Sequence, residues 1–227
     1  MRLGPLVLLS TSLAACAAPA HLAHRSPISG APSALLTPEG RPSPLPSLDS
    51  AGAAAGVDGE AVAASARELV GRPHVPSDDG RFPDDCTGLV RAVYSRHGVD
   101  LMREGAPAGG NGVAAIWRYA QRHGSLHRDA PVPGDIVFFT ETYDRNRDGR
   151  DNDGLTHVGI VDRVDEDGTV HVIHRVARGV VSYRMNLARP SLRQDASGRV
   201  LNDWLREGKK SRLAGELFAG YGTVGKQ

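Results

Sequence analysis

The sequence has few cysteines, no long apolar run and almost no net charge. Its 227 residues include two cysteines, Cys16 and Cys86, which allow at most one disulfide. No run of 18 apolar residues occurs, so we expect no membrane-spanning helix. The formal net charge of +1 gives no electrostatic reason to expect nucleic acid or an anionic membrane surface as a partner. Hydrophobic content of 40% and charged content of 23% are typical of a globular domain.

The first sixteen residues have the organisation of a secretory signal. Arg2 precedes a short apolar run that ends in small residues and Cys16. The segment LAAC, residues 13–16, resembles the lipobox of bacterial lipoproteins, in which the cysteine is lipidated and the chain is cut just before it. An ordinary cleavable signal is the alternative. The resemblance implies an exported protein held at the cell envelope by lipid on Cys16, with no other membrane contact. Cys86 would then have no disulfide partner.

Composition divides the rest of the chain into a tether and a domain. Residues 17–56 contain seven prolines among alanine, serine and glycine, a composition that does not bury enough apolar surface to fold. We expect a disordered tether there and a folded domain over residues 57–227, in which residues 185–227 form a C-terminal extension. We expect the protein to act as a monomer.

The hydrophobic period changes from helical to extended along the domain. Helical patterns with capping residues occupy 57–71, 86–98 and 111–124. Alternating or continuous apolar runs predict strands at 135–140, 157–164, 169–175, 179–185 and 217–224. Residues 193–210, between the last two strands, predict a loop with a short helix. Helices followed by strands indicate an α+β domain, with N-terminal helices packed on an antiparallel sheet.

Cys86 is the candidate nucleophile. It lies at the first turn of a predicted helix, where the helix amides favour a thiolate over a thiol. Asp84 and Asp85 would oppose that effect unless they face the helix amides. Burial as a small hydrophobic residue is the alternative for a lone cysteine.

Strand parity selects the histidines that could serve this thiol. The segment VDEDGT predicts a hairpin turn with a four-residue loop at 165–168, which would pair Val164 with Thr169. His174 would then be the diagonal neighbour of His157 on the same face, about 7–8 Å away by backbone position. A three-residue loop would turn His174 to the other face. His171 has the opposite parity and should leave the face.

Three ordered motifs carry a family resemblance. DDCTGLVRAVY, PVPGDIVFF and THVGIVDRV followed by VIHR are similar to those of NlpC-type and CHAP cysteine peptidases, a papain-like superfamily that acts on bacterial cell walls. The resemblance covers about residues 57–185. It implies a papain-like α+β fold and hydrolysis of an amide bond in peptidoglycan, with Cys86 as nucleophile, His157 as base and His174 as the third polar residue. This chemistry requires no cofactor.

One position departs from the family pattern. NlpC-type enzymes have a tyrosine twelve residues before the cysteine, which assists the oxyanion, and here that position is His74. The resemblance thus implies that His74 and the Cys86 amide hold the oxyanion, since an imidazole N–H is also a donor. Two rivals stay open. One is a non-catalytic lipoprotein that binds wall fragments or a partner through the same cleft, and the other is a papain-like acyltransferase.

The charged run before His157 has two interpretations. Asp144, Asn146 and Asp148 occupy positions 1, 3 and 5 of a loop like that of an EF-hand, and the Arg150 carbonyl falls at position 7. Position 12 lacks its acid, although Asp151 or Asp153 could supply a ligand instead. We expect the run to brace His157, with calcium as a structural stiffener. A self-neutralising solvated turn is the alternative, and zinc is disfavoured because a third acidic ligand is missing.

Overall fold

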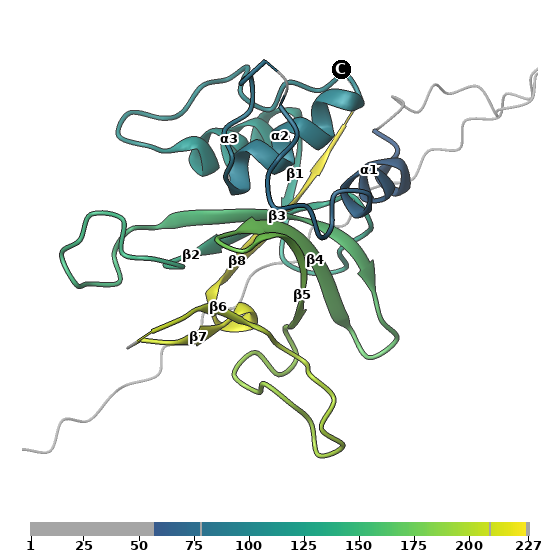
Figure 1. Ribbon diagram of the computed structural model, residues 1–227, viewed down its shortest axis with the longest axis vertical. Helices are drawn as coiled ribbons and strands as arrows, with labels where there is room; N and C mark the ends of the chain where they lie inside the picture. Colours follow the sequence, from purple (N-terminus) through teal and green to yellow (C-terminus); the bar gives the residue numbers. More distant parts are fainter. Residues whose placement is uncertain (1–56, 78, 209, 226–227) are drawn as a thin grey trace, which may run out of the picture. The chain divides into compact units, whose positions relative to one another are not determined.

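The computed structural model describes residues 57–225 apart from 78 and 209. The signal, the tether and Cys16 therefore lie outside the described residues. Three helices and a six-stranded antiparallel sheet make up most of the domain (Figure 1). The helices are α1 (Gly59–Arg67), α2 (Cys86–Arg96) and α3 (Gly112–His123). The strands of the sheet are β1 (Gly124–His127), β2 (Ile136–Thr140), β3 (Leu155–Val164), β4 (Thr169–Val176), β5 (Gly179–Asn186) and β8 (Phe218–Val224). The expected α+β class is confirmed.

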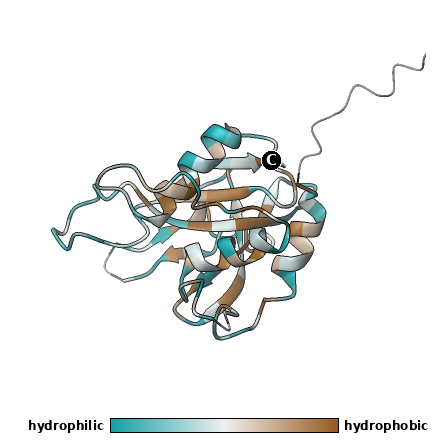
Figure 2. Cartoon of the chain, turned by 90° about the horizontal axis from the view of Figure 1, so that it is seen from above, coloured by the Kyte–Doolittle hydropathy of each residue, from teal (hydrophilic) through white to brown (hydrophobic). Residues whose placement is uncertain are grey.

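All three helices begin where the sequence predicts a cap. The side chains of Asp58, Asp85 and Asn111 each accept a hydrogen bond from a first-turn amide, which satisfies one of the unpaired donors at a helix start. Their apolar faces pack on one side of the sheet (Figure 1). Apolar colour is concentrated on the strands and on the sheet-facing sides of the helices, and the loops are mostly hydrophilic (Figure 2).

The sheet has strand order β1-β8-β2-β3-β4-β5, and each of its faces carries a core cluster. Phe138, Ile160 and Ile173 face the helices. Val137, Val161 and Val172, one residue away on the same strands, face the C-terminal extension instead. Both faces of β2, β3 and β4 are therefore buried, which explains their continuous apolar sequences.

The C-terminal extension differs from the prediction. Where we expected a loop with a short helix, the chain forms a bridge between Gln194 and Val200 and then β6 (Trp204–Arg206), which pairs with β7 (Arg212–Leu213). The helical turn that does form, η1 (Ala214–Leu217), comes later and covers the second cluster. The sequence also gave no signal for β1, which continues directly from the end of α3. In the described part of the chain, no helix is long and apolar enough to cross a membrane.

Two motif glycines are required by close backbone contacts. A Cβ on Gly88 would lie 1.7 Å from the Pro83 carbonyl oxygen, so only glycine lets the first turn of α2 approach that loop. Gly134, in the PVPGD motif, has φ +87° and would place a Cβ 2.4 Å from the Gly59 oxygen. The second contact seats α1 against the start of β2, and Tyr94 of α2 donates a hydrogen bond to the Gly134 carbonyl at 2.6 Å.

Candidate active site

Cys86 is the first residue of α2, and the residues around it fix its position. The Asp85 carboxylate accepts hydrogen bonds from the Gly88 amide at 2.9 Å and the Thr87 hydroxyl at 2.7 Å. Asp85 thus faces the helix amides, as expected. The Cys86 amide belongs to the first turn, where N–H groups have no partner within the helix. It bonds instead to the sulfur of its own side chain and lowers the pKa of that thiol.

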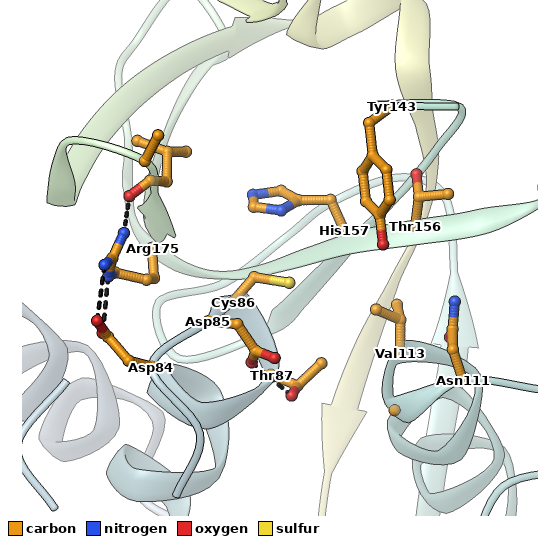
Figure 3. Close-up of a pocket in the computed structure, with 13 residues that line it drawn as sticks. Asp84, Asp85, Cys86, Thr87, Asn111, Val113, Tyr143, Thr156, His157 and Arg175 are labelled. Carbon is orange, nitrogen blue, oxygen red and sulfur yellow. Dashed lines mark hydrogen bonds and ion pairs between the residues drawn. The ribbon is translucent and has the colours of Figure 1, made fainter. Parts of the chain in front are cut away.

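Cys86 and His157 line the same cavity, which has a volume of about 490 Å³ (Figure 3). The side chains come from the start of α2, the start of α3, the charged loop and the first residues of β3. Within the described residues no hydrogen bond joins the Cys86 sulfur to the His157 ring. Catalytic contacts of this kind are commonly loose in the absence of substrate.

His157 and His174 are hydrogen-bonded to each other. Their Nε2 and Nδ1 atoms are 2.8 Å apart, and the side chains are 8% and 1% exposed. The expected pairing of these two histidines on one face is thus confirmed. His171 lies elsewhere, with its Nε2 2.8 Å from an Asp165 carboxylate oxygen.

The pairing of β3 with β4 agrees with the predicted register near the two histidines but differs from it near the turn. Val161 pairs with Val172, as the predicted register requires, but Val164 pairs with Val170 and not with Thr169. An irregularity between Val161 and Arg163 shifts the register by one residue between the turn and the site. The loop between the strands is residues 165–168, as predicted, but the predicted pairing of Val164 with Thr169 is wrong. The bulge restores the predicted faces at His157.

The hydrogen bond constrains the tautomers of the two rings. If His157 is to accept a proton at Nδ1, its Nε2–H must donate to His174 Nδ1. His174 then carries its proton on Nε2, a buried atom that has no hydrogen-bond partner in the described structure. The His174 ring stands edge-on to Tyr183, with centroids 4.4 Å apart and planes at 71°. An N–H directed at an aromatic face is a weak donor contact. We assign this arrangement because it gives His157 the lone pair that a base requires.

Burial keeps the thiol and both histidines neutral. Burial, followed by the charge of Asp85, raises the pKa of the Cys86 thiol to about 12. Burial lowers the pKa of His157 to about 4, against a small opposing effect of Asp85. Burial and then His157 hold the pKa of His174 well below its ordinary value. A thiolate–imidazolium pair is therefore disfavoured at neutral pH.

This result corrects the expectation that the helix start makes Cys86 a thiolate. The amides of Val158, Thr87 and Cys86 itself do lower the pKa of the thiol. Desolvation of the sulfur outweighs them, because a buried anion loses more hydration than a few amides replace. With its pKa raised in this way, the Cys86 thiol keeps its proton at neutral pH.

His74 does not line the cavity. Its side chain is 75% exposed, and Nδ1 lies 2.7 Å from an Asp84 carboxylate oxygen. Asp84 also binds Arg175 in a bidentate pair of 2.9 and 2.8 Å, and this contact with Arg175, then that with His74, holds the pKa of Asp84 well below its usual range. The Asp84–Arg175 pair joins the loop before α2 to β4. No contact in the structure supports the expected oxyanion role of His74.

The acids of the charged loop are engaged by the protein itself. Asp144 accepts from the amides of Asp148 and Gly149, and Asp153 accepts from those of Arg145 and Asn146. The Arg150 amide bonds to the side chain of Asp148. Among the described residues no group of three or more acids, histidines or cysteines is arranged to hold a metal.

Asp151 ties the charged loop to the C-terminal extension. It lies 2.9 Å from Arg206, 3.5 Å from Lys210 and 3.6 Å from Arg212. Arg206 also donates to the Glu141 carbonyl at 3.0 Å. The loop that leads into β3 is thus tied to the extension by a set of cations. The expectation that this loop braces His157 stays a prediction.

Four cavity residues were missed by sequence reasoning: Asn111, Tyr143, Thr156 and Arg175. Asn111 was recognised only as a helix cap. Arg175 follows His174 in the VIHR motif, which was a usable signal. Tyr143 stands between two charged segments and has no sequence feature that marks it. Figure 3 shows its hydroxyl pointing into the cavity on the side of Cys86.

Comparison with known proteins agrees with this geometry. Residues 76–175, which include Cys86, His157 and His174, match the family model of the CHAP domain. A gamma-D-glutamyl-L-lysine dipeptidyl-peptidase of Bacillus cereus is 28% identical over 71 residues. That match covers 31% of this chain and 18% of the relative.

We predict that the domain loses stability as the pH falls from 6.5 to 4 partly through His157. In this window the unfolded chain protonates the residue and the folded chain does not, so the unfolded state binds more protons and the free energy of unfolding falls. A difference between pKa values of 6.5 and about 4 corresponds to about 3 kcal/mol. Urea denaturation at several pH values should show a shallower pH dependence for His157→Gln. His171→Gln, the matched control, should keep the wild-type slope. Equal slopes in all three proteins would contradict the buried neutral histidine.

We also predict that Cys86 alkylates slowly at pH 7. A thiol of pKa about 12 is ionised at roughly 1 part in 10⁵ at this pH, far less than free cysteine. The measurement is the rate of iodoacetamide modification by mass spectrometry in a Cys16→Ser chain, with free cysteine as the reference. The rate should still rise above pH 10. A rate faster than that of free cysteine, with an inflection below pH 7, would show a preformed thiolate.

Proposed function

We propose that this protein is a cell-envelope cysteine peptidase or amidase that hydrolyses an amide bond of peptidoglycan. The CHAP domain and the peptidase relative support hydrolysis of this class. The observation that carries the proposal is the shared cavity, in which a helix-start cysteine faces the same space as a histidine hydrogen-bonded to a second buried histidine.

The proposed mechanism starts from a neutral thiol and a neutral imidazole. Cys86 attacks the carbonyl carbon while its proton moves to His157 Nδ1, so charge develops only as the bond forms. His174 holds the His157 ring through the 2.8 Å hydrogen bond and accepts the Nε2–H. His157 then gives the proton to the leaving nitrogen. Water repeats the sequence on the acyl-enzyme.

Two donors are available for the oxyanion. The Cys86 amide is one, as expected from the family. The Tyr143 hydroxyl, which points into the cavity, takes the part that we had expected of His74 (Figure 3). A phenol in a partly desolvated site is a suitable donor to a developing negative charge.

We predict that substitutions of the site residues reduce activity to different extents, according to the role of each residue. Cys86→Ala and His157→Ala should abolish digestion of peptidoglycan by the full chain, and His174→Ala should lower the rate by about 10² or more, because it leaves the base unoriented. His171→Ala should retain wild-type activity. The measurement is mass analysis of the muropeptides released with time, which also identifies the bond that is cut.

A non-catalytic binding module is the rival function. The observation that favours it is the protonated thiol, which has no hydrogen bond to His157. The rival function would be established if the wild-type chain released no muropeptides from peptidoglycan and the Cys86→Ala variant still bound the wall. Equal losses in His171→Ala and His174→Ala would also contradict the assigned roles.

We further propose that lipid on Cys16 anchors the protein at the envelope, with the domain free to reach the wall. The LAAC segment supports this, and no other membrane contact is needed. Cells that express the full chain should incorporate labelled palmitate into it, and Cys16→Ser should abolish the label and release the protein into the soluble fraction. Labelling that persists in Cys16→Ser would contradict the anchor.

Calcium at Asp144, Asn146, Asp148 and Asp153 stays a prediction. Binding would require the carboxylates to exchange amide partners for the ion. At a Kd of ~1 mM, 10 mM calcium should stabilise the fold by about 1.4 kcal/mol through mass action. Melting curves with calcium and with chelator test this, and Asp144→Ala should remove the difference. Identical curves for the wild type would leave the extension cations as the sole brace.

A further inference from the structure

A second cavity lies next to the proposed active site and shares His157 with it. Its volume is about 460 Å³, within the range of small-ligand sites. The two cavities share Tyr143, His157 and the segment 175–177, but Cys86 lines only the first. The far wall of the second cavity comes from the C-terminal extension. It consists of Trp204 and Leu205, which belong to β6, and Glu207, which follows β6.

The walls of this cavity are aromatic and preformed. Tyr143 and Trp204 are 50% and 38% exposed, and they are the only aromatic side chains among the exposed large hydrophobic residues of the described chain. Both line the second cavity. Arg206, two residues beyond Trp204, bonds to Glu141 and Asp151 and so fixes β6 to the loop that carries Tyr143. Exposed aromatic groups held on both walls of a cavity indicate a ligand site more than a folding core.

The cavity also presents one cation and one anion, Arg178 and Glu207, that pair with no opposite charge among the described residues. The Arg178 guanidinium lies over the Tyr183 ring at 5.1 Å and donates to its hydroxyl, so its position is fixed. In the described part of the chain neither Arg178 nor Glu207 forms an ion pair. Arg175 differs, since Asp84 already neutralises it.

The residues that line the two cavities assign each cavity to one side of the scissile bond. Cys86 forms its bond to the acyl carbon, so the acyl part of a substrate must occupy the first cavity. His157 returns the thiol proton to the amide nitrogen as the C–N bond breaks, so the departing amine must lie beside His157. The second cavity contains His157 but not Cys86, which places the leaving amine and its substituents there.

We infer that the second cavity is the leaving-group subsite of the proposed hydrolase and that it binds an amino acid with a free carboxylate and a basic side chain. The carboxylate pairs with Arg178, the side-chain ammonium pairs with Glu207, and the aliphatic stem lies between Tyr143 and Trp204. The inference rests on the proposed function for the identity of the bond. It gives the C-terminal extension, which the CHAP match does not cover, a role in substrate selection.

The test uses the full chain with Cys86→Ala, so that binding is measured without turnover. The chain has two tryptophans, and Trp204 lines the cavity whereas Trp117 packs against Phe138. Titration with L-lysine should shift the ¹⁵N-indole signal of Trp204 and leave that of Trp117 in place. L-Lysinamide, which lacks the carboxylate, and L-norleucine, which lacks the amine, should each bind about tenfold more weakly.

Charge-removing variants then separate the two contacts. Arg178→Gln should make the affinities for lysine and lysinamide equal, and Glu207→Gln should make the affinities for lysine and norleucine equal. Arg193→Gln and Glu166→Gln, at exposed positions outside both cavities, are the matched controls and should keep the wild-type preferences.

Failure of this inference is distinguishable from failure of the proposed function. A Trp204 signal that does not move with L-lysine up to 50 mM, or equal affinities for the three ligands, would overturn the subsite even if the wild-type chain digests peptidoglycan. Selective binding of L-lysine with no digestion by the wild type would overturn the leaving-group assignment and leave a ligand site of a binding protein.

Discussion

The hydrogen bond between His157 and His174 is the contact on which the proposed site depends. It is buried between β3 and β4, where the pKa of each ring is lowered by loss of solvent. Two neutral imidazole rings can form a hydrogen bond only if one of the two contacting nitrogens carries a proton and the other does not. In the arrangement that the proposed mechanism uses, Nδ1 of His157 has no proton and the N–H of His174 is on Nε2, and the His174 and Tyr183 rings form a T-shaped contact. Protonation of His174 at Nδ1 would remove the acceptor for His157, whereas protonation of His157 at Nδ1 places a charge in a buried environment but leaves the hydrogen bond in place.

A neutral base beside a neutral thiol changes how the nucleophile is activated. The helix start lowers the pKa of Cys86, but burial of the sulfur dominates and the thiol keeps its proton. In the proposed mechanism, proton transfer then accompanies attack, which makes the orientation of His157 more important than the resting charge of Cys86. The braces around the site serve that orientation. The Asp84–Arg175 pair ties α2 to β4, and the extension cations hold the loop that leads into His157.

Local chemistry predicted most of the fold and part of the site. Asp85 and Asn111 were recognisable as caps because short polar side chains before an apolar period have few other uses. The parity of His157 and His174 followed from the period of two in strands. The bulge between Val161 and Arg163 could not be predicted from the sequence, because one added residue does not change the pattern of an apolar run.

The remaining differences come from tertiary contacts. The pKa of Cys86 depends on how completely the fold excludes water, which position in a helix does not reveal. His74 was placed by resemblance alone, and its contact with Asp84 draws it away from the cavity. Trp204 and Arg206 lie in a segment with no clear period, so neither the strand β6 nor its position beside His157 was predictable.

The protonation state of the two histidines is the most direct test of this account. ¹⁵N NMR of imidazole-labelled full chain reports which nitrogen of each ring carries the proton. At pH 7 the account predicts that both rings are neutral, with protons on Nε2, and that His157 titrates only near pH 4. An imidazolium signal from His157 at pH 7 that disappears in Cys86→Ala would show a thiolate–imidazolium pair and contradict the account.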